Sequence, residues 1–193
     1  MKRLYIIAGC NGAGKTTASY TVLPEMLNCK EFVNADEIAK GLSPFNVDAV
    51  AVEAGRLMLN RIAMLLEKGE TFSIETTLAT RSYLNLVKKA QSLGYSVMLL
   101  FFWIDSPSLA KNRVAKRVSE GGHDIPPDVI SRRYHKGLKN LFEIFMPIVD
   151  DWLLYDNNNT LAQLVAMGGK NKENIVENKV TYEKITNIWK RMR

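Results

Sequence analysis

A stretch near the start of the chain carries the side chains and the backbone freedom needed to hold a phosphate group. The run Gly-Cys-Asn-Gly-Ala-Gly-Lys-Thr-Thr at 9–17 matches the P-loop pattern GxxxxGK[ST] at every fixed position. Its glycines allow backbone N–H groups to converge on an anion. Lys15 supplies a positive charge for the β- and γ-phosphates, and Thr16 supplies a hydroxyl for Mg²⁺. The predicted nucleotide-binding residues are Gly9, Asn11, Gly12, Ala13, Gly14, Lys15, Thr16 and Thr17, with Thr16 as the metal ligand.

The segments on either side of this loop predict a strand, a phosphate-binding loop and a helix, in that order. The apolar run 4–8 is typical of a parallel strand that is buried on both faces. Apolar residues recur at helical spacing from 18 to 27. A helix that starts at the loop would point its positive end at the bound anion. The alternative is a glycine-rich turn that holds no ligand.

Two later apolar segments finish in polar residues. The predicted strands 31–36 and 71–77 both end in carboxylates and other polar groups. Because ligands of open α/β sheets lie outside the carboxyl ends of the strands, these groups are expected to face the phosphates. The candidate site residues from the two strand ends and the start of the next helix are Asn34, Asp36, Glu75, Thr77 and Arg81.

Helix capping is the competing explanation for several of these residues. Asp36 could cap the helix that follows it, and Thr77 or Thr80 could cap a helix over 81–93. Capping does not account for Glu75, because a buried strand favours Val or Ile at such a position. The sequence therefore favours a site role for Glu75.

The segment 95–104 is the most apolar of the predicted strands and is expected at the centre of the sheet. Asp105 follows it directly, and two explanations of equal weight apply. An acidic residue at this place supports Mg²⁺ in many P-loop proteins. Alternatively, Ser106 and Pro107 begin a helix as its N-cap and first residue, and Asp105 only precedes it.

A dense basic segment on either side of Gly121-Gly122 is typical of a helical lid that closes over phosphates, here over about 106–145. Two or three of its cations are expected to be functional, and the others to be solvated surface charges. His123 in the glycine turn suits acid–base chemistry and a structural hydrogen bond about equally. The candidate lid arginines are Arg113, Arg117, Arg132 and Arg133.

The order of the elements predicts an α/β fold with a mostly parallel central sheet and helices on both faces, the three-layer arrangement of P-loop NTPases. The segment 151–156 is the last main strand, and three asparagines at 157–159 form a turn after it. A C-terminal hairpin and helix are expected over about 160–193. We predict one domain over 1–193.

Composition limits the function classes. The chain of 193 residues is 47% hydrophobic and 24% charged, as in an ordinary globular protein. Two cysteines do not make a disulfide framework. The longest apolar run is too short for a membrane span, and the N-terminus lacks the apolar region of a signal peptide. A cytoplasmic location is expected. The net charge of +6 indicates an anionic partner such as a nucleotide, a sugar nucleotide or a nucleic acid.

Together, these motifs resemble the zeta-toxin family of P-loop kinases. The resemblance rests on the P-loop, on Asn34-Ala35-Asp36, on Glu75-Thr76-Thr77 and on the basic segment 117–134, and it spans roughly 3–157. Founding members of the family phosphorylate the 3′-hydroxyl of the sugar of UDP-N-acetylglucosamine with ATP or GTP, and an antitoxin protein restrains them. The resemblance therefore implies ATP or GTP with Mg²⁺, a small hydroxyl substrate and an antitoxin partner.

The resemblance also implies roles for individual residues. Asp36 would accept the proton of the sugar hydroxyl, and Arg117 would stabilise the phosphoryl group in transfer, beside Lys15. A second lid arginine of the toxins falls where this chain has Gly-Gly-His-Asp, so that Arg132 or Arg133 would have to supply its charge. The implied substrate-binding residues at the strand ends are Asn34, Glu75, Thr77 and Arg81.

Other functions stay open from the residues alone. A polynucleotide kinase would use the same loop and the basic surface, but the aromatic residues that stack on bases are not evident, so nucleic acid is not the expected partner. A kinase for another metabolite fits equally well. A non-enzymatic nucleotide switch needs no acceptor carboxylate, and the pair Asp36 and Glu75 argues against it.

Overall fold

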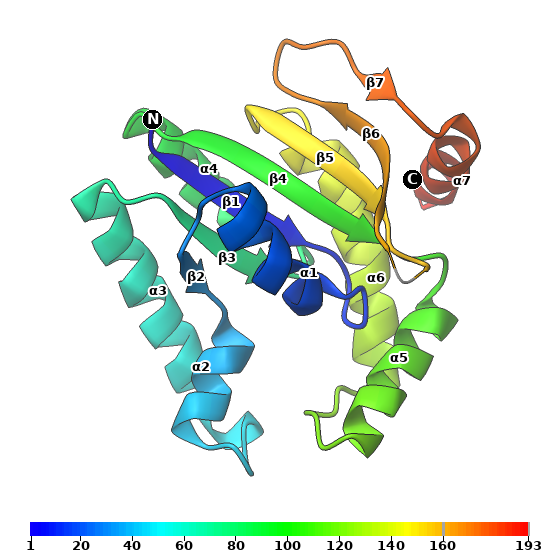
Figure 1. Ribbon diagram of the computed structural model, residues 1–193. Helices are drawn as coiled ribbons and strands as arrows, with labels where there is room; N and C mark the ends of the chain where they lie inside the picture. The colour runs from blue at the N-terminus through cyan, green and yellow to red at the C-terminus, as the bar shows by residue number, and fades with distance from the viewer. Residues whose placement is uncertain (160, 193) are drawn as a thin grey trace.

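The computed structural model describes residues 1–159 and 161–192. In this part of the chain the strands form one sheet in the order β2-β3-β1-β4-β5-β6-β7 (Figure 1). The strands from β2 to β5 in this order run parallel, and β6 and β7 are antiparallel to their neighbours. The strand bounds are β1 (Arg3–Ala8), β2 (Glu31–Val33), β3 (Phe72–Thr76), β4 (Ser96–Trp103), β5 (Asp151–Asp156), β6 (Gln163–Gly168) and β7 (Ile175–Val176).

Helices cover both faces of this sheet, which confirms the predicted α/β fold. The helices are α1 (Lys15–Thr21), α2 (Ala35–Leu42), α3 (Ala51–Lys68), α4 (Tyr83–Ser92), α5 (Pro107–Ser119), α6 (Pro127–Asn140) and α7 (Lys179–Lys190). Shorter turns are η1 (Val22–Met26), η2 (Asp48–Val50) and η3 (Leu141–Phe145).

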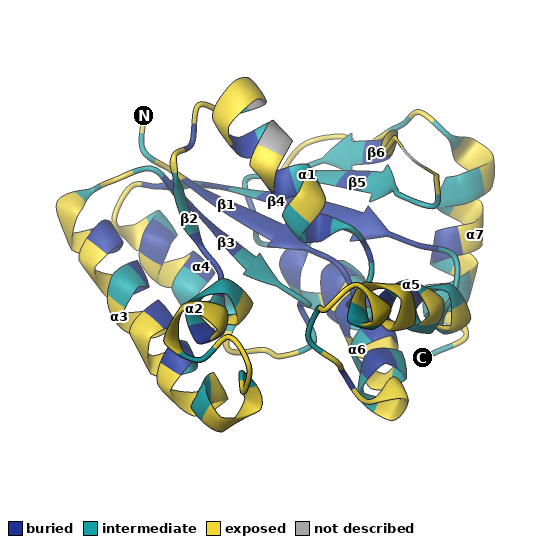
Figure 2. Cartoon of the chain, turned by 60° about the horizontal axis from the view of Figure 1, so that its bottom comes forward, coloured by how far each residue is buried: buried dark blue, intermediate teal, exposed yellow. Residues whose placement is uncertain are grey.

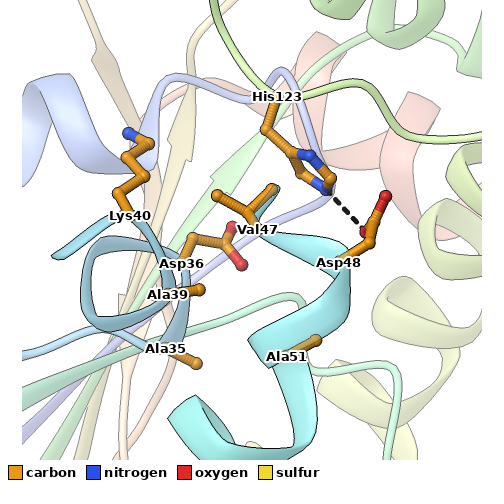
Figure 3. Close-up of a pocket in the computed structure, with 8 residues that line it drawn as sticks. All are labelled: Ala35, Asp36, Ala39, Lys40, Val47, Asp48, Ala51 and His123. Carbon is orange, nitrogen blue, oxygen red and sulfur yellow. Dashed lines mark ion pairs between the residues drawn. The ribbon is translucent and has the colours of Figure 1, made fainter. Parts of the chain in front are cut away.

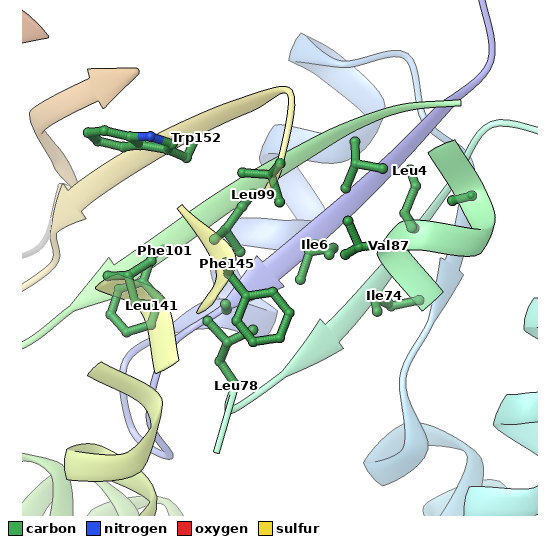
Figure 4. Close-up of a cluster of buried hydrophobic side chains, with 14 of the residues drawn as sticks. Leu4, Ile6, Ile74, Leu78, Val87, Leu99, Phe101, Leu141, Phe145 and Trp152 are labelled. Atoms are coloured by element: carbon green, nitrogen blue, oxygen red, sulfur yellow. The ribbon is translucent and has the colours of Figure 1, made fainter. Parts of the chain in front are cut away.

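Strand β1 shows why its sequence is apolar without interruption. Leu4 and Ile6 face a cluster that includes side chains of α3, α4 and η3, whereas Tyr5 and Ile7 face a second cluster with side chains of α5 and α6. The first cluster is drawn in Figure 4. Because both faces are covered, every position of the strand favours an apolar residue. Figure 2 shows the central strands buried between helices whose outer faces are exposed.

Several predicted boundaries differ from the structure, and capping explains most of the differences. Strand β2 ends at Val33, and Asn34 caps α2 by accepting a hydrogen bond from the N–H of Asp36 at 2.8 Å. Asp36 therefore lies in the first turn of a helix and not at a strand end. The prediction that Thr77 or Thr80 caps the next helix was wrong, since α4 begins at Tyr83 after Ser82.

The C-terminal part contains the predicted hairpin and helix with shifted bounds. β6 and β7 pair as an antiparallel hairpin, and α7 begins at Lys179, three residues before the predicted helix start at Tyr182. Asn178 caps this helix, because its side-chain oxygen accepts from the N–H of Thr181 at 3.0 Å. Positions 160 and 193, the ends of the predicted C-terminal unit, lie outside the described residues. The single domain and its lid boundaries stay predictions.

No helix of the described part has both the length and the apolar character that crossing a membrane requires.

Gly137 of α6 marks the place where this helix packs directly on the backbone after β3. A Cβ at Gly137 would lie 2.5 Å from the carbonyl oxygen of Thr77, while a Cβ at Gly55 of α3 would meet nothing within 4 Å. We expect Gly137→Ala to lower the free energy of unfolding by about 1–3 kcal/mol. Gly55→Ala is the matched helical control and should raise it by about 0.5–1 kcal/mol. Urea denaturation measures both, and equal effects would contradict the packing argument.

Candidate active site

The P-loop adopts the conformation that its glycines predict. Gly9, Gly12 and Gly14 all have positive φ, at 145°, 78° and 78°. A Cβ at Gly12 would lie 2.7 Å from the carbonyl oxygen of Ala110, and one at Gly9 would collide with the carbonyl of Phe102. Glycine is therefore required at these positions for two reasons, the backbone angle and the close approach. The loop leads into α1, which begins at Lys15.

Lys15 is buried against the loop that precedes it. Only 6% of the residue is exposed, and its Nζ donates to the carbonyl of Cys10 at 3.0 Å. The same Nζ lies 3.6 Å from Oε1 of Glu75, so that the two side chains form a buried ion pair. A desolvated ammonium group exerts a stronger electrostatic effect on a nearby phosphate than an exposed one.

Glu75 joins the loop to the neighbouring strand. In the parallel pair of β1 and β3, Glu75 stands opposite Ile7, directly before the loop. Its Oε2 accepts hydrogen bonds from Oγ1 of Thr16 at 2.8 Å and from Nδ2 of Asn34 at 3.0 Å. Three of the residues predicted from separate motifs, together with Lys15, thus form one network at the carboxyl ends of the strands. The contact of Glu75 with a substrate stays a prediction.

A cleft of about 840 Å³ opens beside this network. Thr16 of the P-loop, Asp36 of α2 and Arg117 of α5 line it together. The predicted phosphate loop, the predicted base and the predicted lid arginine therefore face one space. Thr77 and Arg81 are not among the described residues that line it, and Arg81 is exposed.

A smaller pocket lies next to Asp36, between α2, η2 and the loop that follows α5 (Figure 3). The carboxylate of Asp36 points into it, and His123 approaches from the opposite side. Nε2 of His123 lies 3.5 Å from Oδ1 of Asp48. This contact joins the two sides of the pocket, and the choice between an acid–base and a structural role for His123 stays open.

The four candidate lid arginines have different environments. Arg117 is exposed and its Nη2 donates to the carbonyl of His123 at 2.7 Å. Arg133 reaches the P-loop, with Nη1 3.2 Å from Oδ1 of Asn11. Arg132 is exposed, and Arg113 donates only to backbone carbonyls. Of the alternatives Arg132 and Arg133, the structure places Arg133 at the loop.

Comparison with known proteins shows the family and the fold of the chain. A sequence description of the family named zeta toxin matches residues 1–162. The chain belongs to the zeta toxin family. The chain is also similar to an uncharacterized protein of Haemophilus influenzae strain Rd, which is 28% identical over 127 residues, or 65% of this chain and 88% of the relative.

Two solved structures show how this zeta toxin fold compares. AvrRxo1-ORF1 in complex with AvrRxo1-ORF2 and ATP has a TM-score of 0.76 at 19% identity, over 96% of this chain and 64% of that one. A structure from the PezAT chromosomal toxin–antitoxin system of Streptococcus pneumoniae has a TM-score of 0.65 at 18% identity, over 99% and 86%. The chain thus spans less than two thirds of the AvrRxo1 chain. At these identities the likeness concerns the fold.

Asp105 was a candidate that the sequence left open, and its surroundings favour the helix start. Ser106 caps α5 by accepting from the N–H of Leu109 at 3.2 Å, and Pro107 is the first helical residue. The carboxylate of Asp105 lies 2.5 Å from Nζ of Lys184 in α7. No sequence pattern indicates this ion pair, because Lys184 lies in a different element, 79 positions further along the chain.

Two buried groups near the zeta toxin site, Cys10 and Tyr134, have raised pKa values. Burial raises the pKa of Cys10 to about 11, so that this thiol stays protonated near neutral pH. Burial also raises the pKa of Tyr134, whose hydroxyl accepts a hydrogen bond from Nε1 of Trp103. Within the described residues, no three His, Cys, Asp or Glu side chains gather as a metal site.

The buried pair of Lys15 and Glu75 gives a stability prediction. Removing the carboxylate leaves a buried ammonium without its counter-charge, so Glu75→Ala should lower the free energy of unfolding by about 3 kcal/mol. Glu31 offers a matched control, since its pair with Arg61 at 2.6 Å is about two-fifths exposed. Glu31→Ala should change stability by less than about 1 kcal/mol. Urea denaturation of both variants tests this, and similar losses would contradict it.

Proposed function

We propose that the protein is an ATP-dependent kinase that transfers a γ-phosphoryl group to a hydroxyl of a small molecule. One observation carries the proposal: Thr16 of the P-loop, Asp36 and Arg117 line a single cleft. A phosphoryl donor held by the loop and an acceptor hydroxyl beside the carboxylate would meet there. Membership of the zeta toxin family supports the same reaction class.

The residues present fit a magnesium nucleotide. The P-loop glycines have the positive φ angles that let backbone N–H groups converge on an anion. The hydroxyl of Thr16 and the carboxylate of Glu75 supply the oxygen atoms that Mg²⁺ prefers. When bound, Mg²⁺ would offset the negative charge of the phosphates. We propose ATP over GTP because a structure with the same fold was solved with ATP.

Different side chains of this chain have different roles in the proposed phosphoryl transfer. The acceptor oxygen attacks the γ-phosphorus, the bond to the β–γ bridging oxygen breaks, and ADP leaves with that oxygen. Asp36 takes the proton of the hydroxyl. Lys15 and Arg117 stabilise the negative charge that spreads over the phosphoryl oxygens. Arg133, beside Asn11 of the loop, is placed to supply the second positive charge.

We propose UDP-N-acetylglucosamine or a related sugar nucleotide as the first candidate acceptor. Lys40, Arg117 and His123 line the cleft and suit an anionic substrate, and the fully exposed ring of Phe45 lines it too. The predicted contacts of Asn34, Glu75, Thr77 and Arg81 with the acceptor belong to this proposal. An antitoxin partner is proposed on the same grounds, since a structure of like fold comes from a toxin–antitoxin system.

The role of Asp36 is tested by Asp36→Asn, which keeps the shape of the side chain and removes its basicity. We expect ATP binding to be retained and transfer to fall at least about 100-fold, as for the loss of a general base. Glu37→Gln, the next carboxylate in the same cleft, should keep most of the activity. Transfer rates and calorimetric ATP affinity are measured for both. Full activity in Asp36→Asn would refute the assigned base.

The acceptor is tested by incubation with labelled ATP and a panel of UDP-sugars, small metabolites and oligonucleotides, with mass spectrometry as the readout. The proposal predicts an added phosphate on a sugar-nucleotide hydroxyl. Phosphorylation of oligonucleotide ends alone would instead identify a polynucleotide kinase. ATP binding without transfer to any acceptor would leave a nucleotide switch as the better description.

A further inference from the structure

The outward side of the P-loop is held by side chains from elsewhere in the fold. A loop that turns its N–H groups toward an anion must turn its carbonyl groups outward, where they need donors of their own. The carbonyl of Gly12 accepts from Nη1 of Arg113 at 3.4 Å, and that of Ala13 accepts from Nδ2 of Asn157 at 2.7 Å. Both donors lie far from the loop in sequence.

Arg113 and Asn157 are also hydrogen-bonded to each other. Nη1 of Arg113 donates to the carbonyl of Asn157 at 2.9 Å, and Nη2 donates to that of Asn158 at 2.7 Å. The N–H of Asn157 donates to the carbonyl of Trp103 at 2.8 Å, which ties this turn to the end of β4. The planar guanidinium group thus connects α5, the turn after β5 and the loop, a geometry that an ammonium group does not reproduce.

The side chain of Asn157 packs at the point where α1 begins. A Cβ at Gly14 would lie 2.5 Å from Nδ2 of Asn157, so the amide group occupies the space next to this residue. Gly14 is the N-cap of α1 and has no side chain that could cap the helix itself. The asparagine therefore holds the backbone in place at Gly14, the residue directly before Lys15, where the loop ends and α1 begins.

We propose that Asn157 and Arg113 are positioning residues of the phosphate-binding loop. They hold the Gly12 and Ala13 carbonyls outward, so that the N–H groups of the loop converge before a nucleotide arrives. The guanidinium group of Arg113 acts on the loop backbone in this proposal, a role that differs from the predicted one of a lid arginine. The inference deepens the proposed function and rests on it for the identity of the ligand.

The test compares calorimetric affinities for Mg·ATP and for inorganic tripolyphosphate. Asn157→Ala removes the donor to Ala13 without changing charge. Asn159→Ala is the matched control, because Asn159 is exposed in the same turn. We expect Asn157→Ala to weaken binding of both probes about 10-fold, the size expected for one lost hydrogen bond of about 1.4 kcal/mol. The control should stay within about twofold of the wild type. Equal affinities in the two variants would overturn the proposal.

Arg113→Lys separates positioning from charge. If Arg113 neutralised phosphate directly, lysine would keep most of the affinity and Arg113→Gln would lose it. The positioning role predicts that both variants lose affinity, because neither side chain spans the three carbonyls. Retained affinity in Arg113→Lys overturns the proposal. This variant also keeps the test decisive if Asn157→Ala does not fold.

Thermal unfolding of the same samples separates positioning from a merely structural role. A lowered midpoint with unchanged affinity for both probes overturns the proposal, whereas weaker binding by a folded variant supports it. Binding is measured without an acceptor, so the outcome does not depend on transfer. Wild-type protein that binds both probes but phosphorylates nothing would refute the proposed kinase activity and leave this inference standing.

Discussion

The buried ion pair between Lys15 and Glu75 is the interaction on which the site depends. It takes an ammonium and a carboxylate out of water, which is unfavourable unless further hydrogen bonds accompany the pair. The carbonyl of Cys10 accepts a hydrogen bond from Lys15, while Thr16 and Asn34 donate hydrogen bonds to Glu75. A bound phosphate would give Lys15 a second anionic partner, so the lysine stays satisfied both with and without a nucleotide.

The position of this pair follows from the topology of the sheet. β1 lies between β3 and β4, and parallel neighbours bring their carboxyl ends to one edge. The loop after β1 therefore meets Glu75 of β3 on one side and the backbone of Phe102 in β4 on the other. The elements that flank the cleft, α2 with η2 and α5 with its following turn, touch through Asp48 and His123. The network of Lys15 and Glu75 lies at the edge of the sheet, whereas Asp36 and Arg117 of the cleft lie on these outer elements.

The features that could be predicted from the sequence are local ones. Gly9, Gly12 and Gly14 predict positive φ angles, which favour glycine, and the apolar run before them predicts a buried strand. Asp36 was placed beside the phosphates, but on the wrong kind of element, because the side chain of Asn34 ends the strand and starts a helix. The contacts of Arg113 were not predictable, since its carbonyl partner at Asn157 lies 44 positions away.

The basic composition shows why a residue type alone does not define a role. A net charge of +6 suggested many cations for an anionic ligand, yet several of them act within the protein. Arg113 donates to backbone carbonyls and Lys184 pairs with Asp105 beside the ring of Trp103. Arg113 satisfies carbonyl oxygens of the P-loop and of the turn after β5, whereas Lys184 offsets the charge of a half-exposed carboxylate. The charge available to a substrate is therefore that of the cations on the cleft walls and at the loop, which is why the geometry of the cleft and not the overall charge identifies the chemistry.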